Sequence, residues 1–279
     1  MTLPAPVKYV NPEVPPSQPG ASVELPYGFG PLPEHARNKK IFYFDIDNCL
    51  YRRSTQIHDM MQVKIHQFFK DNLQLNDEDA HKLHILYYQT YGLAIEGLVR
   101  NHQIDALEYN SKVDDSLDLK SALSYNQELR DMLLSIKNDH DYDHLWLITN
   151  AYKNHALRVI SFLGLGDLFD GLTFCDYSKF PIVCKPMPKF FNDCLATTNV
   201  DFSDKAAVAK QTFIDDSEIN VKAAHDLGFG TVIHYVEIEK DLARILAKDD
   251  FEKYYGNGDN SDKSKIQIIK DILDLKLVI

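Results

Sequence analysis

Short runs of consecutive apolar residues recur along the chain. The first, IFYFDI, begins at Ile41 and is rich in aromatic and β-branched residues, which is typical of a strand covered on both faces in a parallel sheet. Four later runs share this pattern: LWLIT at 145–149, GLTF at 171–174, TFID at 212–215 and TVIHYV at 231–236. Helical patterns separate them, notably at 152–163, 186–197 and 217–227. The alternation predicts βαβ units and an α/β fold with a doubly wound parallel sheet.

The segment 54–130 interrupts this alternation, because its apolar residues recur three and four positions apart. One face of its first predicted helix carries Ile57, Met60, Met61, Ile65, Phe68 and Phe69. Further helical patterns follow at 77–91, 92–101 and 104–112. We expect a small helical bundle inserted after the first strand, acting as a cap over a site. A structural subdomain with no part in catalysis is the alternative.

The two ends of the chain differ from the centre. Residues 1–38 hold most of the twelve prolines and show no periodic apolar face, so we expect an extended leader. The catalytic core then comprises 39–53 and 131–279. Near the C-terminus, the break GNGDNSD precedes SKIQIIKDILDL, a run that predicts an amphipathic terminal helix.

Composition narrows the class of partner. The 279 residues carry a net charge of −11, which argues against a nucleic-acid polymer, because such binding depends on clustered Lys and Arg. No apolar stretch is long enough to cross a bilayer and no signal peptide is recognised. Four cysteines show no paired metal-ligand spacing, which favours free thiols. We expect a cytoplasmic protein that does not bind membranes, with nuclear entry and oligomeric state left open.

Acidic residues follow two of the predicted strands. Asp45 and Asp47 end the first, and Asp215 and Asp216 end TFID. Ligands of open parallel sheets bind beyond the carboxyl ends of the strands. Close carboxylates repel one another unless a cation neutralises them, and oxygen ligands suit Mg²⁺. Loop acids facing water or capping a helix are the alternative at each position.

Two further signals lie between these acid pairs. Thr149 and Asn150 end LWLIT, where a hydroxyl group and backbone N–H groups can hold phosphoryl oxygens. Lys185 lies in the loop Cys184-Lys185-Pro186 before a predicted helix. Each is ambiguous alone, as a helix cap or a surface charge. In order, however, an acid pair, a hydroxyl group, a lysine and a second acid pair indicate metal-assisted phosphoryl transfer.

The segments FDIDNCLY, ITNA, CKP and IDDS resemble the four ordered motifs of the haloacid dehalogenase superfamily, over roughly residues 40–236. The runs YGLAIEGLV, DALEYNSKVDDSLDL and LWLITNAYKNHALRVISFLGLGDLFDGLTFCDY more narrowly resemble fungal pyrimidine 5′-nucleotidases. The resemblance implies a Rossmann-like core with a helical cap, and a Mg²⁺-dependent phosphatase that dephosphorylates UMP and CMP. Nicotinamide mononucleotide or lysophosphatidate as substrate, or a non-catalytic binding module, remain alternatives.

The resemblance also implies residue roles. Asp45 would be the nucleophile that forms an aspartyl-phosphate, and Asp47 the general acid and then base. Thr149 and Lys185 would hold the transferring phosphoryl group. Because breaking a phosphate ester requires a protonated leaving group and dehalogenation does not, Asp47 favours a phosphatase over a dehalogenase.

The metal site and the substrate site are less sharply defined. Mg²⁺ would be bound by the Asp45 carboxylate, the Asp47 backbone carbonyl and the fourth-motif acids. The sequence leaves open whether Asp215 or Asp216 is the direct ligand, and we favour Asp216. For the rest of the substrate the candidate contacts are the following side chains: Tyr51, Tyr109, Asn110 and Asn150, with Tyr87, Tyr88 and Tyr91 as further aromatic candidates. For most of these tyrosines and for Asn110 we favour the alternative that the side chain belongs to the cap core.

One position departs from the common first motif, which usually has Thr or Val where this chain has Cys49. We favour a small buried side chain that fills a Thr-sized space. A sharper hypothesis is that oxidation of Cys49 distorts the acidic loop and makes activity sensitive to peroxide.

Overall fold

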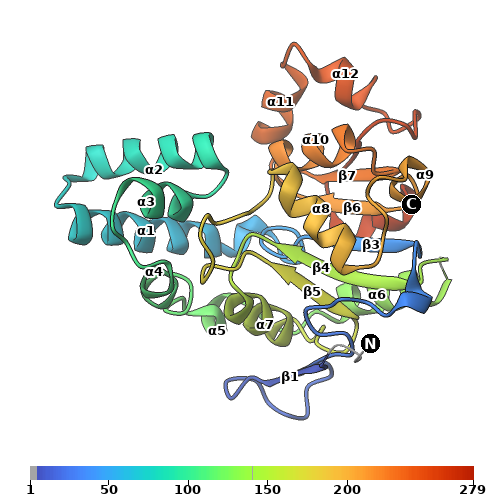
Figure 1. Cartoon of the computed structure of the whole chain (residues 1–279), viewed down its shortest axis with the longest axis horizontal. Helices are drawn as coiled ribbons and strands as arrows, with labels where there is room; N and C mark the ends of the chain where they lie inside the picture. The colour runs from blue at the N-terminus through green and yellow to red at the C-terminus, as the bar shows by residue number, and fades with distance from the viewer. Residues whose placement is uncertain (1–4, 140) are drawn as a thin grey trace.

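A computed structural model describes residues 5–139 and 141–279 (Figure 1). Its centre is a parallel sheet of six strands in the order β5-β4-β3-β6-β7-β8. The strands are β3 (Ile41–Phe44), β4 (His144–Thr149), β5 (Gly171–Phe174), β6 (Thr212–Asp215), β7 (Thr231–Tyr235) and β8 (Gln267–Ile269). The five strands predicted from apolar runs are therefore confirmed, and β8 is an addition.

Helices cover both faces of this sheet. Phe42 and Phe44 of β3 enter a hydrophobic cluster with α6 and α7, while Ile41 and Tyr43 enter a second cluster on the opposite face. The first face is covered by α6 (Gln127–Asp139) and α7 (Lys153–Phe162), with the short α5 (Leu119–Ala122) nearby. The second is covered by α8 (Pro188–Thr197), α9 (Lys205–Val208), α10 (Glu218–Asp226), α11 (Glu239–Leu246) and α12 (Phe251–Tyr255). The predicted doubly wound α/β sheet is confirmed.

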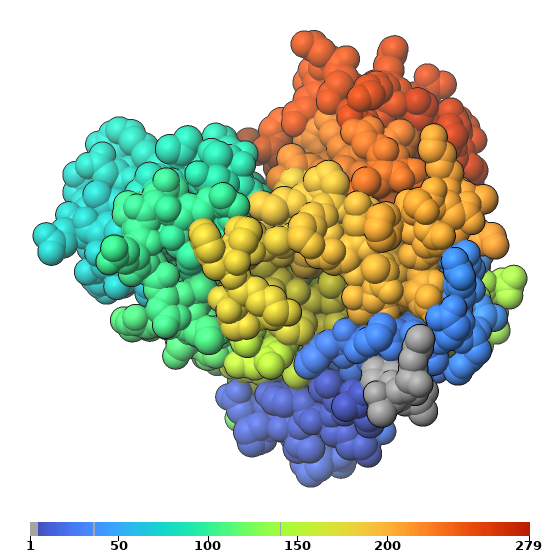
Figure 2. All heavy atoms as spheres, viewed as in Figure 1, coloured from blue at the N-terminus to red at the C-terminus, as the bar shows by residue number. Residues whose placement is uncertain are grey.

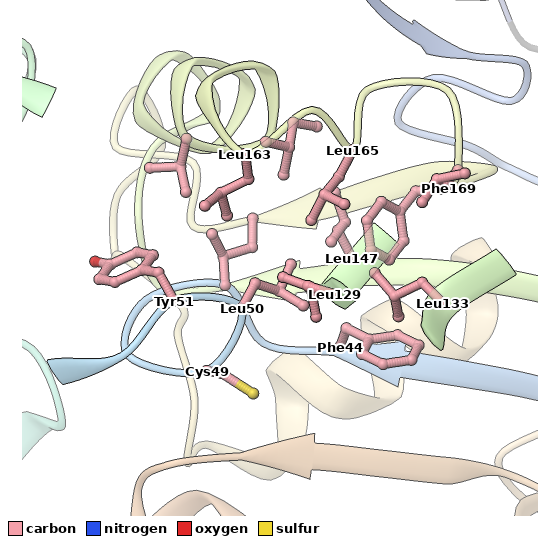
Figure 3. Close-up of a cluster of buried hydrophobic side chains, with 14 of the residues drawn as sticks. Phe44, Cys49, Leu50, Tyr51, Leu129, Leu133, Leu147, Leu163, Leu165 and Phe169 are labelled. Carbon is pink, nitrogen blue, oxygen red and sulfur yellow. The ribbon is translucent and has the colours of Figure 1, made fainter. Parts of the chain in front are cut away.

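Part of the first cluster lies directly beneath the loop that follows β3. Figure 3 shows Leu50 of that loop meeting Leu129 and Leu133 of α6 around Phe44. The same picture shows the Tyr51 hydroxyl group pointing away from the apolar side chains. The loop is thus anchored by burial of apolar groups, which fixes the backbone next to Asp45 and Asp47.

Four helices form the cap beside the sheet (Figure 1): α1 (Ile57–Leu73), α2 (Asp77–Tyr91), α3 (Ala94–Asn101) and α4 (Ala106–Lys112). They have their own hydrophobic cluster, which includes Phe69 and Leu98. Asn76 caps the start of α2 by accepting a hydrogen bond from Asp79 N, and Gly92 ends it at a φ of 81°. Both are ordinary helix-end signals, which explains why α2 has the predicted bounds.

The segment from Leu117 to Leu129, at the end of the predicted insertion, packs with the core. Leu117, Leu119 and Leu129 belong to the cluster beneath the sheet. Hydrophobic packing therefore divides cap from core before residue 130, whereas the exact boundaries of the predicted domains stay a prediction.

The N-terminal segment packs against the core. β1 (Val7–Val10) pairs antiparallel with β2 (Ser22–Leu25), and the short 3₁₀ helix η1 (Glu34–Ala36) follows. Val23 and Leu25 are buried in the cluster that contains α7. The segment therefore covers part of the helix layer, and a second 3₁₀ helix, η2 (Arg53–Thr55), leads into the cap.

The prediction of an amphipathic terminal helix is wrong. The segment instead forms β8 and a 3₁₀ helix, η3 (Ile272–Leu277). β8 pairs in parallel with β7, with Gln267 opposite Ile233. The exposed edge of β7 offers backbone partners that local periodicity does not reveal, and tertiary pairing overrides the helical pattern.

No helix within the described ranges is both long enough and apolar enough to cross a membrane.

Candidate active site

A crevice of about 770 Å³ lies at the carboxyl ends of the central strands, between the cap and the core. Figure 2 shows the hollow between the cap helices and the C-terminal part of the chain. The predicted site residues that line it are Asp45, Asp47, Thr149, Asn150, Lys185, Asp215 and Asp216. The structure therefore brings together residues that are far apart in the sequence, because parallel strands end at one edge.

Lys185 lies at the centre of this group. Its Nζ donates hydrogen bonds to Asp45 Oδ1 and Asp215 Oδ2, each at 2.6 Å, and to the carbonyl oxygen of Ile148 at 3.0 Å. Only 1% of the lysine is exposed. Burial would lower the pKa of Lys185, but the charges of Asp215 and Asp45 outweigh it and raise the pKa above its usual value. The lysine is therefore a fixed cation between two carboxylates.

Three carboxylates converge beside this lysine. One oxygen from each of Asp45, Asp215 and Asp216 lies within 4.8 Å of the others. Burial first, and then the charge of Asp215, raises the pKa of Asp45 well above its usual value and that of Asp216 to about 8. The carboxylates therefore repel one another even beside Lys185. A small divalent cation such as Mg²⁺, which prefers oxygen ligands, would offset this repulsion.

The two fourth-motif acids have different surroundings. Asp215 is fully buried, and its carboxylate accepts hydrogen bonds from Lys185, from Ser217 N at 2.8 Å and from the Asn220 amide at 3.0 Å. Asp216 is only partly buried, and no described residue donates a hydrogen bond to its carboxylate. Asp216 is thus the acid with carboxylate oxygens open toward the crevice, and its role as the direct metal ligand stays a prediction.

Asp47 is held by two donors. Asp47 Oδ1 accepts a hydrogen bond from the Tyr51 hydroxyl group and one from His155 Nε2, each at 2.7 Å. Burial would raise the pKa of Asp47, but the charge and hydrogen bond of His155 outweigh it and hold the pKa below its usual value. Reasoning from the sequence missed His155, because a histidine early in a helix gives no sign of which strand end it faces.

Comparisons with known proteins agree with this geometry. Residues 39–228 match the family model described as haloacid dehalogenase-like hydrolase. Over 255 residues, covering 88% of this chain and 74% of the relative, the chain is 41% identical to Phosphate metabolism protein 8 of Saccharomyces cerevisiae. The chain belongs to the haloacid dehalogenase-like hydrolase family. The predicted superfamily and the prediction of a hydrolytic enzyme are confirmed.

Solved structures of the family are more distant. A haloacid dehalogenase-like hydrolase of Streptococcus pneumoniae is 17% identical with a TM-score of 0.49, and the match covers 86% of this chain and 98% of that one. The hydrolase YfnB of Bacillus subtilis, bound to magnesium, is 11% identical with a TM-score of 0.47, over 86% of this chain and 98% of that one. The family assignment rests on the sequence matches.

In this hydrolase the second and third motifs are tied together. The Asn150 amide donates to the Lys185 carbonyl oxygen at 2.9 Å, and its oxygen accepts from Lys185 N at 2.8 Å. Thr149 is buried, and its Oγ1 accepts from Ala151 N at 3.0 Å. The Asn150 amide thus orients the lysine loop through one hydrogen bond at each of its two polar atoms. Its nitrogen has a second N–H and its oxygen a second lone pair, so the predicted contact with substrate stays a prediction.

The cap wall of the crevice differs from the prediction. It is formed by His58, Met61, Gln62, Ile65, His84, Ile85, Tyr88, Gln89, Gly92 and Leu93. Tyr88 is therefore the one predicted cap aromatic that reaches the crevice within the described part of the chain. Tyr109 and Asn110 are buried, and Tyr109 packs against Phe68. Helical spacing identified these side chains as facing inward but could not tell the bundle interior from the crevice.

The other aromatic candidates also have structural contacts. Tyr51 is buried outside the crevice lining and donates to Asp47. Tyr87 is buried in the cap cluster and hydrogen-bonds His102 at 2.8 Å. The crevice-facing amides of Gln62 and Gln89 were missed, although their spacing from Ile65 and Ile85 by three or four residues was readable in the sequence.

Cys49 is completely buried and belongs to the first hydrophobic cluster. In Figure 3 its thiol points to the side of the loop opposite Leu129 and Leu133. Burial first, and then the nearby Asp45 charge, raises the pKa of its thiol well above the usual value. A buried thiol that resists ionisation reacts slowly with peroxide. These surroundings fit the small space-filling residue better than a redox sensor.

Proposed function

We propose that this hydrolase is a Mg²⁺-dependent phosphatase that cleaves phosphate monoesters through an aspartyl-phosphate on Asp45. The observation that carries the proposal is the convergence of Asp45, Lys185 and Asp216 at one crevice, with Asp47 facing the same space. A phosphate monoester is an anion, and an anionic nucleophile reaches it only if positive charge offsets the repulsion.

The residues of the site divide this work. Asp45 attacks phosphorus, and Lys185 keeps the nucleophile oriented through Asp45 Oδ1. The Thr149 hydroxyl group and backbone N–H groups of its loop hold the phosphoryl oxygens. The Asp45 and Asp216 carboxylates, with the Asp47 carbonyl oxygen, would hold the metal, which when bound supplies positive charge against the phosphate and the acids.

Asp47 acts as the acid and then the base. It gives a proton to the leaving oxygen as the P–O bond of the ester breaks, and it later takes a proton from the water that attacks the aspartyl-phosphate. The negative charge of bound phosphate favours the protonated form of Asp47. This offsets the lowered pKa that His155 imposes in the free enzyme.

For the substrate class we propose pyrimidine nucleoside 5′-monophosphates, UMP and CMP. The resemblance to fungal pyrimidine 5′-nucleotidases supports this assignment, as does a crevice roomy enough for a nucleoside beside the phosphate. On the cap wall, the Gln62 and Gln89 amides could hydrogen-bond the edge of a base, and the Tyr88 ring could stack on it. The yeast relative's name, Phosphate metabolism protein 8, agrees with a phosphorylated substrate.

The decisive experiment measures phosphate release from a panel of esters with Mg²⁺ and with EDTA. We expect release from UMP and CMP in Mg²⁺, none in EDTA, and none from Asp45→Asn. The panel includes purine nucleotides, nicotinamide mononucleotide and lysophosphatidate. Faster release from a purine nucleotide would remove the pyrimidine assignment alone, whereas metal-independent release would contradict the mechanism.

A further inference from the structure

The hydrogen bonds to Asp47 are unevenly shared between its two carboxylate oxygens. Oδ1 accepts from both Tyr51 and His155. Oδ2 accepts no hydrogen bond from any residue that the structure describes. The Asp47 side chain is 23% exposed and lines the crevice, while the His155 side chain is completely buried. The carboxyl group is therefore clamped on its protein side and free on its substrate side.

The clamp is built on rigid elements. His155 is the third residue of α7, directly after the loop that carries Thr149. The helix is fixed by its buried residues Ala156 and Ile160, and near its end the Ser161 hydroxyl group donates to the Ala21 carbonyl oxygen at 2.6 Å. Tyr51 follows the turn closed by Leu50 N and the Ile46 carbonyl oxygen at 2.9 Å. The two donors to Oδ1 thus come from two separate elements, the loop after β3 and α7.

We propose that His155 is a positioning residue which, with Tyr51, turns Asp47 so that its proton is carried on Oδ2 and aimed at the leaving oxygen. This inference rests on the proposed phosphatase function. Because Oδ1 already accepts two hydrogen bonds, a proton added to the carboxyl group bonds to Oδ2. The two donors also remove rotation about the Asp47 side chain, so the acid is oriented before substrate binds.

The step balances as a simple substitution. Asp45 forms a bond to phosphorus as the P–O bond to the leaving group breaks, and the Oδ2 proton of Asp47 moves to the leaving oxygen. Water then attacks phosphorus and gives one proton to Oδ2, while the bond between Asp45 and phosphorus breaks, which releases phosphate and restores the Asp45 carboxylate. His155 touches neither substrate nor reacting atoms, so its effect depends on how much the leaving group needs that proton.

The test compares two leaving groups in single-turnover experiments on the full chain. The 5′-oxygen of the nucleoside in UMP is a poor leaving group that must be protonated as it leaves. The 4-nitrophenolate of 4-nitrophenyl phosphate leaves without a proton. In His155→Phe, which keeps a ring but loses the donor, we expect phosphoryl transfer from UMP to slow about 10-fold to 100-fold. The burst of 4-nitrophenolate and the KM for UMP should each change less than about threefold.

Three further variants sharpen the comparison. Tyr51→Phe should show a smaller split in the same direction, and it carries the test if His155→Phe does not fold. His155→Gln, which restores an N–H donor, should recover part of the rate with UMP. Ser161→Ala removes a buried hydrogen bond from the same helix without touching Asp47, and it should slow both substrates equally or neither.

The outcomes separate the inference from the proposed function. Equal slowing of both substrates in His155→Phe and Tyr51→Phe, or no slowing in either, would overturn the positioning role while leaving a phosphatase. A wild-type chain that forms no phosphoenzyme and releases no phosphate from any ester would overturn both. Selective slowing with UMP supports the role, because a loss of general stability has no means of distinguishing leaving groups.

Discussion

At the scale of single residues, Lys185 shows how strongly one side chain depends on its partners. Its ammonium group is buried and balanced by Asp45 and Asp215. A buried charge loses its hydration, and it is tolerated only where partners replace the lost water. The reverse also holds, because the two carboxylates face one another if the lysine is removed.

Replacing Lys185 with methionine should therefore lower both activity and stability. We expect activity below detection and a loss of about 3 kcal/mol in the free energy of unfolding, because two buried carboxylates remain unpaired. Urea denaturation followed by circular dichroism measures the second effect. Lys189→Met is the matched control, since its ion pair with Asp193 is exposed and should contribute less than about 1 kcal/mol. Similar losses in the two variants would contradict this account.

At the scale of elements, the cap and the loop of the catalytic lysine are packed together. Glu96 of α3 is fully buried, and its carboxylate accepts from Ile182 N at 3.0 Å and pairs with Arg100. Gly92, between α2 and α3, lies against Lys185 and Pro186, where an added Cβ would approach the Lys185 carbonyl oxygen to 2.8 Å. The helical insertion therefore also supports the loop that presents Lys185.

Substituting Gly92 with alanine should test this contact. The residue has a φ of 81°, and its Cβ would also come within 2.6 Å of Pro186 Cδ, so both strain and a backbone clash oppose the change. We expect a loss of about 2 kcal/mol in the free energy of unfolding and a lower kcat.

The control for this variant is Gly228→Ala. Gly228 has a φ of 91°, but no atom lies within 4 Å of the position that an added Cβ would take. Strain alone should cost about 1 kcal/mol there, with kcat unchanged. Equal effects on kcat in the two variants would show that the contact with the lysine loop is unimportant.

The seam between α1 and α2 contains several histidines. His66 Nε2 and His84 Nδ1 are 3.2 Å apart, and His84 lines the crevice. Burial first, and then the charges of His66, His58 and His81, lower the pKa of His84 to about 4. The folded cap therefore holds His84 in its neutral form.

Acid should loosen the cap as a consequence. His84 gains a proton more easily in the unfolded state, so its stabilising contribution is present above pH 6.5 and is lost as the pH falls toward 4. We expect a loss on the order of 2 kcal/mol over that range, measured by hydrogen exchange of the amides in 57–91. His84→Gln should flatten the dependence, whereas His35→Gln, at an exposed position, should leave it unchanged. An unaltered profile in His84→Gln would assign the effect to other groups.

At the scale of the whole molecule, the site joins residues that follow β3, β4, β5 and β6. A ligand that binds there therefore stabilises the complete fold. Three carboxylates converge beside the ammonium group of Lys185. A cation that binds this arrangement in the folded state, and not in the unfolded chain, shifts the folding equilibrium by mass action.

Added Mg²⁺ should therefore stabilise the protein. At a concentration 100 times its Kd, we expect the free energy of unfolding to rise by about 2.7 kcal/mol, and EDTA to reverse the gain. Chemical denaturation with and without the metal measures it. Asp216→Asn, which removes the acid with free oxygens, should lose most of the gain. A full gain in that variant would place the cation elsewhere.

Local sequence patterns determined many of the strands and helices of this hydrolase, and also which residues form its candidate site. The strands at 171–174 and 212–215 and the helix at 77–91 were predicted with their observed bounds, because burial on both faces and helix-end residues act over a few positions. The convergence of Asp45, Thr149, Lys185 and Asp216 also followed from sequence, since all parallel strands end at one edge. The four motifs are weak signals individually, but their order along the chain was sufficient to predict the family.

Only the tertiary structure decided what depends on contacts between distant segments. The pairing of β8 with β7, the clamp of His155 on Asp47 and the different surroundings of Asp215 and Asp216 each join residues that no local pattern relates. The same holds for the cap wall, where Tyr88 faces the crevice and Tyr109 the bundle interior. Periodicity shows that a side chain is covered, but the packing of whole elements determines whether a core or a ligand covers it.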